Sequence, residues 1–403
     1  MIIHRPYKEN EGDWAFVKCK ITDEVNHSDK IIFYSVSKEY SGYLVDEVAD
    51  SFLLAVLLPA IFAGQRIVVK HAISSNLAYN IRTIVYLFSK AFNINVPSDC
   101  IDVQETRNCL FAPSAVMTGF SGGVDSLCTY INHTNENCPG DFQITHLALF
   151  NIGSYGNVYV QSHNDYLNDV KRASVFAQKV AKPLVLVDSN IGELYTHPGL
   201  IYYSMRSTIC LSSAVLALQK LVRRYFISSS GTIDGMKLSR WDQYFYEDAL
   251  VHLLSTDCTT IYISESDLNR VEKTKVLADN PLAQEYLYVC AADIYNAKHG
   301  TSYKKDTAPN CGECLKCERT LLTLDFLGVL SKYAKRFDLK KYATFRSKFV
   351  DGIVIRREDD HFKEEIYSLM LEKGFSPSLR QRVLRCCFIV YSKLRKIKKR
   401  LLK

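Results

Sequence analysis

One run of residues in this chain has the types and order that suit phosphate binding. It reads Gly119-Phe120-Ser121-Gly122-Gly123-Val124-Asp125-Ser126, and it follows a short apolar stretch and precedes a segment with helical periodicity. Adjacent glycines let backbone N–H groups turn toward an anion, and the N-terminus of a following helix adds a favourable dipole. The hydroxyl groups of Ser121 and Ser126 can donate to the same oxygens. The run therefore predicts a phosphate site.

The carboxylate of Asp125 would repel a phosphate unless it binds Mg²⁺ or caps backbone amides, so we expect a metal ion with the nucleotide. No lysine follows the two glycines, which distinguishes the run from the loop of nucleoside triphosphatases that ends in Gly-Lys-Ser/Thr. A Ser/Gly turn with a helix cap and no ligand is the alternative interpretation. The complete string between a strand and a helix favours phosphate.

A second group of residues suits a metal ion. Cys311, Cys314 and Cys317 recur at three-residue intervals, which is too close for disulfides between them but suitable for one tetrahedral ion. Zinc is the natural candidate, and Cys290 is the nearest upstream cysteine that could complete the site. An iron–sulfur cluster, or buried cysteines without metal, are the alternatives.

Composition restricts the class of protein. With 403 residues, 47% of them apolar and 23% charged, the chain can build two domains without extensive disorder. The longest apolar stretch, 52–63, is too short to span a bilayer and contains Pro59, so we expect no membrane span and no signal peptide. Thirteen cysteines, an odd number with four in a metal-like pattern, indicate a reducing cytoplasm.

The charge is unevenly distributed. The formal net charge is +7, while residues 378–403 alone carry ten Lys or Arg and no Asp or Glu, which leaves the rest at −3. Nucleic-acid binding by the body of the protein is therefore disfavoured. The basic tail is amphipathic and suits anionic lipid, nucleic acid, an acidic partner, or plain exposure to solvent.

Hydrophobic patterning predicts an α/β fold in three parts. Residues 1–108 read as an N-terminal α/β domain, 109–335 as strands alternating with helices around a parallel sheet, and 336–403 as a helical extension with the basic tail. In the central part we expect strands at 115–119, 144–150, 184–187 and 225–229, and helices at 125–133, 166–181 and 208–221. We also expect a strand at 286–290, leading to Cys290.

The string Ser121-Gly-Gly-Val-Asp-Ser126 resembles the PP-loop of N-type ATP pyrophosphatases. The resemblance implies an adenine nucleotide alpha hydrolase-like, Rossmann-like fold, in which the loop holds pyrophosphate while AMP moves to the substrate. The additional Cys-x-x-Cys-x-x-Cys, with one cysteine upstream, is similar to 7-cyano-7-deazaguanine synthases over about 114–328. The long flanking segments resemble the enlarged synthase-like proteins of bacterial anti-phage operons.

This resemblance also assigns roles to single residues. It implies catalytic roles for Asp125, Ser126, Lys273 and Asp234. The residues that it places at the nucleotide or substrate are Phe120, Ser121, Gly122, Gly123, Asp125, Ser126, Phe150, Asn151 and Arg206. Arg270 and Arg319 are further candidates near the cysteine group. Helix-cap, turn or exposed ion-pair roles are the alternatives for the charged residues outside the loop.

The function that these features imply is an ATP-dependent ligase. It would adenylate a carboxylate, which the resemblance identifies as a deazaguanine acid. The activated acyl group would then react with ammonia, an amine or an acceptor protein to give an amide or nitrile. ATP, Mg²⁺ and Zn²⁺ would be the cofactors. Operon partner proteins and a homo-oligomer fit the same expectation. The alternatives are sulfur transfer to a base, for which Cys128, Cys210 and Cys258 are the available thiols, and a sensor that binds ATP without turnover.

Overall fold

The computed structural model describes residues 1–97, 99–108, 111–200, 202–292, 296, 301–304 and 308–401, without the side chains of 359 and 395–401. The chain forms two compact units. The first contains residues 1–121 and 132–267, and the second contains 122–131 and 268–403. The boundary between them thus falls inside the glycine-rich loop.

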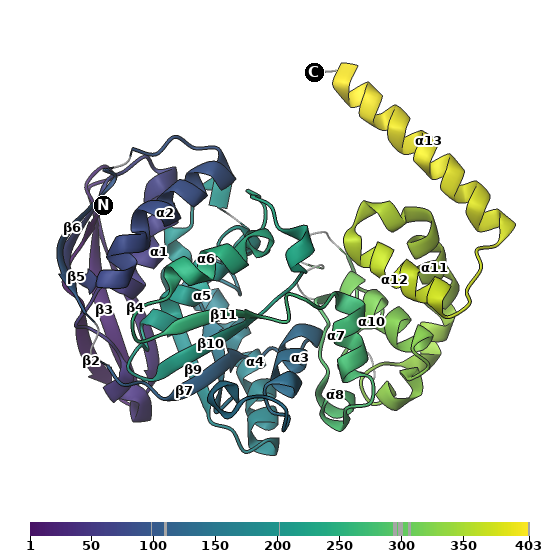
Figure 1. The fold of residues 1–403 in the computed structure, drawn as a ribbon, viewed down its shortest axis with the longest axis horizontal. Helices are drawn as coiled ribbons and strands as arrows, with labels where there is room; N and C mark the ends of the chain where they lie inside the picture. Colours follow the sequence, from purple (N-terminus) through teal and green to yellow (C-terminus); the bar gives the residue numbers. More distant parts are fainter. Residues whose placement is uncertain are drawn as a thin grey trace. The chain divides into compact units, whose positions relative to one another are not determined.

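The first unit is built on one mixed sheet of 11 strands (Figure 1). The sheet order is β11-β10-β7-β8-β9-β4-β3-β1-β5-β6, with β2 paired to β3. Most of its strand pairs are parallel, as the sequence predicted for the core. The strands are β1 (Ile2–Ile3), β2 (Tyr7–Glu11), β3 (Trp14–Asp23), β4 (Ser28–Ser37), β5 (Ile67–Ser74), β6 (Ile101–Arg107), β7 (Ala115–Gly119), β8 (His146–Asn151), β9 (Leu184–Ser189), β10 (Val222–Ser228) and β11 (Thr260–Ser264).

The order of the parallel strands reverses beside the glycine-rich loop. From β7 the chain proceeds through β8 to β9 in one direction, and then returns to place β10 on the other side of β7. Such a switch point leaves a crevice outside the carboxyl ends of the strands, which is where open α/β sheets bind ligands. Phe120 and Ser121 follow β7 at this point.

Helices cover both faces of this sheet. Figure 1 shows α1, α2, α5 and α6 on one face and α4 on the other. Helix α1 is apolar after its first two residues, and all but its last residue are buried, as expected for a helix inside the core. Helix α2 is amphipathic instead, and its N-cap Ser74 accepts a hydrogen bond from the backbone of Leu77. The helices of this unit are α1 (Asp50–Phe62), α2 (Ser75–Phe92), α4 (Tyr159–Lys179), α5 (Ser207–Leu216) and α6 (Glu247–Leu254).

The N-terminal strands continue the same sheet through β4 and β9. Their antiparallel pairing aligns Tyr34 with Ser189 and Ser35 with Asp188. The hydroxyl of Ser35 donates to the carbonyl oxygen of Asp188 at 3.2 Å, which strengthens this junction. Residues 1–108 therefore extend the parallel core by hydrogen-bonded strands.

The second unit is helical in its described part. Leu321 and Leu324 of α10, Ile353 of α11 and Ile366 and Met370 of α12 form its buried interior. The helices are α3 (Val124–Asn132), whose last residue belongs to the first unit, α7 (Arg270–Leu277), α8 (Pro281–Tyr286), α10 (Leu315–Phe326), α11 (Leu339–Arg356), α12 (His361–Glu372) and α13 (Leu379–Leu401). Searching the described helices reveals none that is long and apolar enough to cross a membrane.

One predicted strand is wrong. Residues 287–290 are irregular, and Tyr286 belongs to α8. The backbone N–H groups of Val289 and Cys290 donate to the side-chain oxygen of Asn310, at 2.8 and 3.0 Å, instead of to a neighbouring strand. Helix α4 also begins seven residues before the predicted 166, because the polar segment 159–165 carries little apolar periodicity.

Candidate functional site

The glycine-rich loop joins β7 to α3 as predicted. Gly122 has φ of +77°, which strains any other residue, and its carbonyl oxygen accepts a hydrogen bond from the backbone of Tyr288 at 2.7 Å. The carbonyl oxygen of Gly123 accepts from the backbone N–H of Leu127 at 3.0 Å and from the hydroxyl of Ser126 at 3.3 Å. These bonds fix the first turn of α3.

Two cations of α7 approach the carboxylate of the loop. Nη2 of Arg270 lies 2.9 Å from Oδ2 of Asp125, and Nζ of Lys273 lies 4.0 Å from Oδ1. Asn269 caps α7 by a capping box, and the two cations stand three residues apart on one face of the helix. Only 2% of the Lys273 side chain is exposed. A buried ammonium beside a glycine-rich helix N-terminus is a strong attractor for anions.

Arg319 of α10 belongs to the same basic cluster in the second unit. Its guanidinium lies 4.2 Å from the centre of the Phe362 ring, and that of Arg270 lies 5.5 Å from the same centre. Nη2 of Arg319 pairs with Asp360 at 3.1 Å. Arg270, Lys273 and Arg319 therefore lie in one unit with Asp125.

In the first unit, Arg206 is the largest fully buried side chain, with 1% exposed. It precedes α5, and its guanidinium stacks on the ring of Tyr195 at 4.1 Å. Nη2 donates to Asn157 and, at 3.5 Å, to the carbonyl oxygen of Gly153, whose φ of +89° and tight packing require glycine. Within the described part of the chain, Nε and Nη1 have no hydrogen-bond partner. A buried guanidinium with two unused N–H groups suits an anionic ligand.

The two predicted aromatic residues lie in the core. Phe120 stacks on Phe176 of α4 with ring centres 3.9 Å apart, and Phe150 stacks on Tyr225 of β10 at 5.7 Å. Their side chains therefore support the sheet, and only their backbone atoms remain for a ligand. The backbone N–H of Phe120 already donates to Ala148 of β8 at 2.8 Å.

Asn151 joins a buried polar group that the sequence analysis missed. Its side-chain amide donates to Oδ1 of Asp188 at 2.7 Å. Oδ2 of Asp188 accepts from the hydroxyl of Tyr159 at 2.7 Å and contacts Nδ1 of His163 at 2.6 Å. These residues meet at the carboxyl ends of β8 and β9. A carboxylate at the end of a predicted strand, with Tyr and His in the segment that precedes the helix predicted before it, was the available signal.

Asp234 is not brought into this group. It lies exposed in a 3-10 turn, Ile233–Gly235, after β10.

Burial raises the pKa of the Cys210 thiol, and Cys128 is fully buried, so neither thiol has the exposed, thiolate-favouring surroundings of a reactive cysteine. Cys258 donates to the carbonyl oxygen of Phe111 at 3.4 Å.

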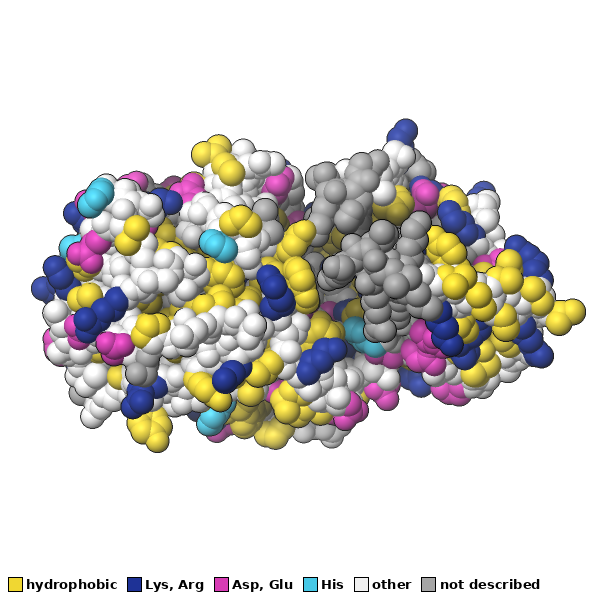
Figure 2. Space-filling model, turned by 90° about the horizontal axis from the view of Figure 1, so that it is seen from above, with side chains coloured by type: hydrophobic (Ala, Val, Ile, Leu, Met, Phe, Trp, Pro, Cys, Tyr) yellow, Lys and Arg dark blue, Asp and Glu magenta, His cyan; other side chains and the backbone are white. Residues whose placement is uncertain are grey.

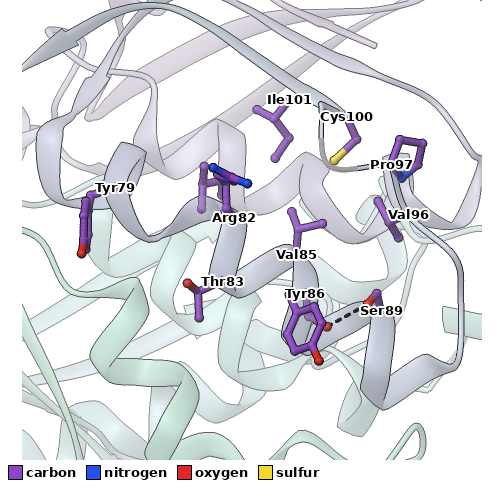
Figure 3. A pocket seen from close by; sticks show the side chains of 11 residues that line it. Tyr79, Arg82, Thr83, Val85, Tyr86, Ser89, Val96, Pro97, Cys100 and Ile101 are labelled. Carbon is purple, nitrogen blue, oxygen red and sulfur yellow. Dashed lines mark hydrogen bonds between the residues drawn. The ribbon is translucent and has the colours of Figure 1, made fainter.

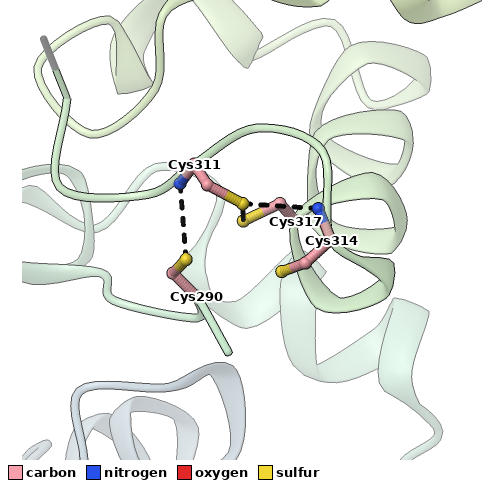
Figure 4. A group of neighbouring side chains, drawn as sticks. All are labelled: Cys290, Cys311, Cys314 and Cys317. Atoms are coloured by element: carbon pink, nitrogen blue, oxygen red, sulfur yellow. Dashed lines mark hydrogen bonds between the residues drawn. The ribbon is translucent and has the colours of Figure 1, made fainter. Parts of the chain in front are cut away.

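The four predicted metal ligands converge. The sulfurs of Cys290, Cys311, Cys314 and Cys317 all lie within 4.8 Å of one another (Figure 4). The sulfurs of Cys311 and Cys317 are 3.8 Å apart, which is the separation of tetrahedral ligands at a zinc–sulfur distance of about 2.3 Å. The group can therefore hold a metal ion such as zinc.

Backbone N–H groups already point at these sulfurs. Cys311 donates to the sulfur of Cys290 at 3.4 Å, and Cys314 donates to that of Cys311 at 3.3 Å. Such bonds stabilise thiolates and orient metal ligands. Hydrogen bonding with Cys311 lowers the pKa of Cys290, which also favours its thiolate form.

No model of a known protein family, no curated protein and no solved structure matches this chain. The site must therefore be interpreted from its own residues. The strongest features of the second unit are the loop with its cations and the four-cysteine group, and that of the first unit is the buried guanidinium of Arg206.

A separate cavity of about 550 Å³ lies beside α2 and β6 (Figure 3). Tyr79, Arg82 and Tyr86 line it from α2, with Cys100 and Ile101 from the start of β6. None of the residues predicted to bind nucleotide lines this cavity, and it plays no part in the proposed site.

Asn310 holds together the two segments that carry the cysteines. Its side-chain amide donates to the carbonyl oxygens of Leu287 and Arg336, at 3.1 and 3.0 Å, besides accepting from Val289 and Cys290. Replacing Asn310 with alanine removes the hydrogen-bond partner of several backbone groups. We expect the free energy of unfolding to fall by about 3 kcal/mol.

Chemical denaturation of the metal-loaded protein measures this loss. The exposed Asn95, changed to alanine, is the matched control and should change stability by less than about 0.5 kcal/mol. Equal stability of the two variants would contradict the role given to Asn310.

Proposed function

We propose that the chain is an ATP pyrophosphatase of the PP-loop type that transfers AMP from ATP to a substrate carboxylate and then links the activated acyl group to an amine. The observation that carries this proposal is the glycine-rich loop of Ser121–Ser126 at a switch point of the sheet, followed by a helix whose Asp125 is approached by Arg270 and Lys273.

The charges around the loop suit a pyrophosphate leaving group. Without a ligand, Asp125 is a carboxylate that lies near both Arg270 and Lys273. A bound triphosphate offers these cations more negative charge than Asp125 alone. Oδ1 of Asp125 accepts no hydrogen bond from the described residues, so this carboxylate could hold Mg²⁺, which would neutralise part of the phosphate charge.

A second anionic group is accommodated by Arg206. Its unused N–H groups, on Nε and Nη1, are charge-assisted donors for an anion, and the guanidinium stacks on the ring of Tyr195. We therefore assign the carboxylate of the substrate acid to Arg206. A deazaguanine acid is the substrate that the resemblance suggests.

The chemistry needs no side-chain nucleophile. A carboxylate oxygen attacks the α-phosphorus of ATP, the new O–P bond forms, and the bond to the β-phosphate oxygen breaks to release pyrophosphate. The loop N–H groups, Ser126 and Lys273 stabilise the charge on the departing group. An amine nitrogen then attacks the acyl carbon, loses a proton and displaces AMP to form an amide, which a second activation could convert to a nitrile.

Incubating the protein with ATP, the deazaguanine acid and ammonia tests the proposal. We expect AMP and pyrophosphate only when the acid is present, together with an amide identified by its mass. ATP binding without AMP would support a sensor. A product that contains sulfur would support sulfur transfer, and either result contradicts the ligase. In cells, the same chemistry would serve the anti-phage role suggested by the resemblance.

Arg206 offers a prediction that separates a ligand-binding role from a structural one. Methionine at this position keeps the packing on Tyr195 but removes the charge. We expect KM for the acid to rise about 10- to 100-fold, because a charge-assisted hydrogen bond contributes about 1.5–3 kcal/mol. Thermal stability should be retained, because a buried cation with unused donors costs desolvation energy.

Steady-state kinetics with varied acid and varied ATP distinguish the two substrates. The partly exposed Arg223, changed to methionine, is the control and should leave KM unchanged. An unfolded Arg206→Met protein, or an unchanged KM for the acid, would contradict the assignment.

A further inference from the structure

Helix α13 has two different faces. One face rests on α11, where the amide nitrogen of Gln381 lies 2.7 Å from Oδ1 of Asp351. Arg385 of the same face donates to the carbonyl oxygen of Val354 at 3.4 Å. These contacts fix the N-terminal half of α13 and so determine which of its side chains point away from α11.

The opposite face is exposed and mostly apolar, although it includes Arg380, which pairs with Asp351 of α11 at 3.2 Å. Its apolar side chains recur at intervals of three and four residues, which at ~100° per residue places them on about half of the helix circumference. They are Leu379, Val383, Leu384, Cys386, Cys387, Val390, Tyr391 and Leu394. Leu379, Val390 and Leu394 are 79%, 58% and 60% exposed. In the sequence the same spacing continues to Ile397 and Leu401.

The segment that carries this apolar face is strongly basic. The segment 378–403 contains ten Lys or Arg and no Asp or Glu. Seen from above, hydrophobic and basic side chains lie side by side over α13 (Figure 2). An exposed apolar stripe in a segment whose charged residues are all basic is the pattern of helices that lie in a membrane interface.

We propose that α13 binds an anionic lipid surface, with the stripe from Leu379 to Leu394 inserted among the acyl chains and the cations at the headgroups. A second copy of the helix would bring two strongly basic segments together without a single acidic residue between them. A nucleic acid would use the cations but leave the apolar stripe in water. A lipid surface uses both features, and it does not depend on the proposed ligase activity.

Flotation of the full-length protein with vesicles tests this proposal. We expect binding to vesicles of equal parts phosphatidylcholine and phosphatidylserine, at least about tenfold weaker binding to phosphatidylcholine alone, and weakening by added salt. The double variant Val390→Gln/Leu394→Gln changes no charge and should lose about tenfold or more of the binding to the mixed vesicles.

A matched control removes two exposed valines elsewhere. Val158→Gln/Val160→Gln, at the start of α4 in the first unit, should bind mixed vesicles like the parent protein. Equal binding by Val390→Gln/Leu394→Gln would overturn the proposal, as would vesicle binding that survives deletion of 378–403. Binding of duplex DNA without vesicle binding would overturn it in favour of nucleic acid.

Discussion

Replacing Lys273 with methionine is expected to slow AMP formation about a hundredfold. Removal of one preorganised donor to a developing negative charge costs about 10²–10³ in kcat. Lys273 is 2% exposed and lies 4.0 Å from Asp125, so its ammonium is held in position before ATP arrives. Methionine has a similar length and lacks the charge. We therefore expect the loss in kcat with the fold retained.

The same helix supplies the control for this experiment. Lys275 is two residues further along α7, with 44% of its side chain exposed and a 3.6 Å pair to Glu372. Lys275→Met should retain the parent rate of AMP formation, measured by single-turnover kinetics with saturating ATP and acid. A Lys273→Met enzyme within about threefold of the parent rate would contradict the role assigned to Lys273.

Removing the metal is expected to unfold much of the second unit. The free energy of binding a structural zinc ion, about 10–16 kcal/mol, is comparable to the whole stability of a typical domain, about 5–15 kcal/mol. Cys317 lies in the first turn of α10 and Cys290 follows α8, so the site joins two separate segments of the chain. We expect a strong chelator, or Cys317→Ser, to lower the thermal midpoint and expose the helices of this unit to protease.

Elemental analysis tests which metal the protein binds and whether Cys317 is needed to hold it. The parent protein should contain one zinc ion per chain, and Cys317→Ser should contain little. Cys386→Ser removes an exposed cysteine of α13 and should keep both the zinc and the thermal midpoint. A parent protein without bound metal, or a Cys317→Ser protein of unchanged stability, would contradict a structural metal site. Iron with sulfide in place of zinc would identify a cluster instead.

Local signals were sufficient to predict the loop and the cysteine group. The strand before Gly122, the helix after it and the Cys311–Cys317 spacing are all set by neighbouring residues. Cys290 was predicted correctly, although the strand before it was not. Its segment is held by the side chain of Asn310, 20 residues further along the chain, and no local pattern encodes that contact.

The features that the sequence did not predict depend on contacts between distant segments of the chain. The junction of β4 and β9 pairs Tyr34 with Ser189, and nothing in either strand identifies its neighbour. The group around Asp188 has the same origin, because Asn151, Tyr159 and His163 meet it only when β8, β9 and α4 assemble. Nearby sequence therefore predicted the local elements better than it predicted the contacts between distant segments.

The central claim is that ATP is cleaved between its α- and β-phosphates. Phosphorus NMR of a reaction with ATP and the carboxylic acid substrate observes this cleavage directly. We expect equal amounts of AMP and pyrophosphate to appear, with hydroxylamine trapping the acyl group as a hydroxamate. Formation of ADP and inorganic phosphate instead would contradict the account, since the bond broken would then be the one to the γ-phosphate.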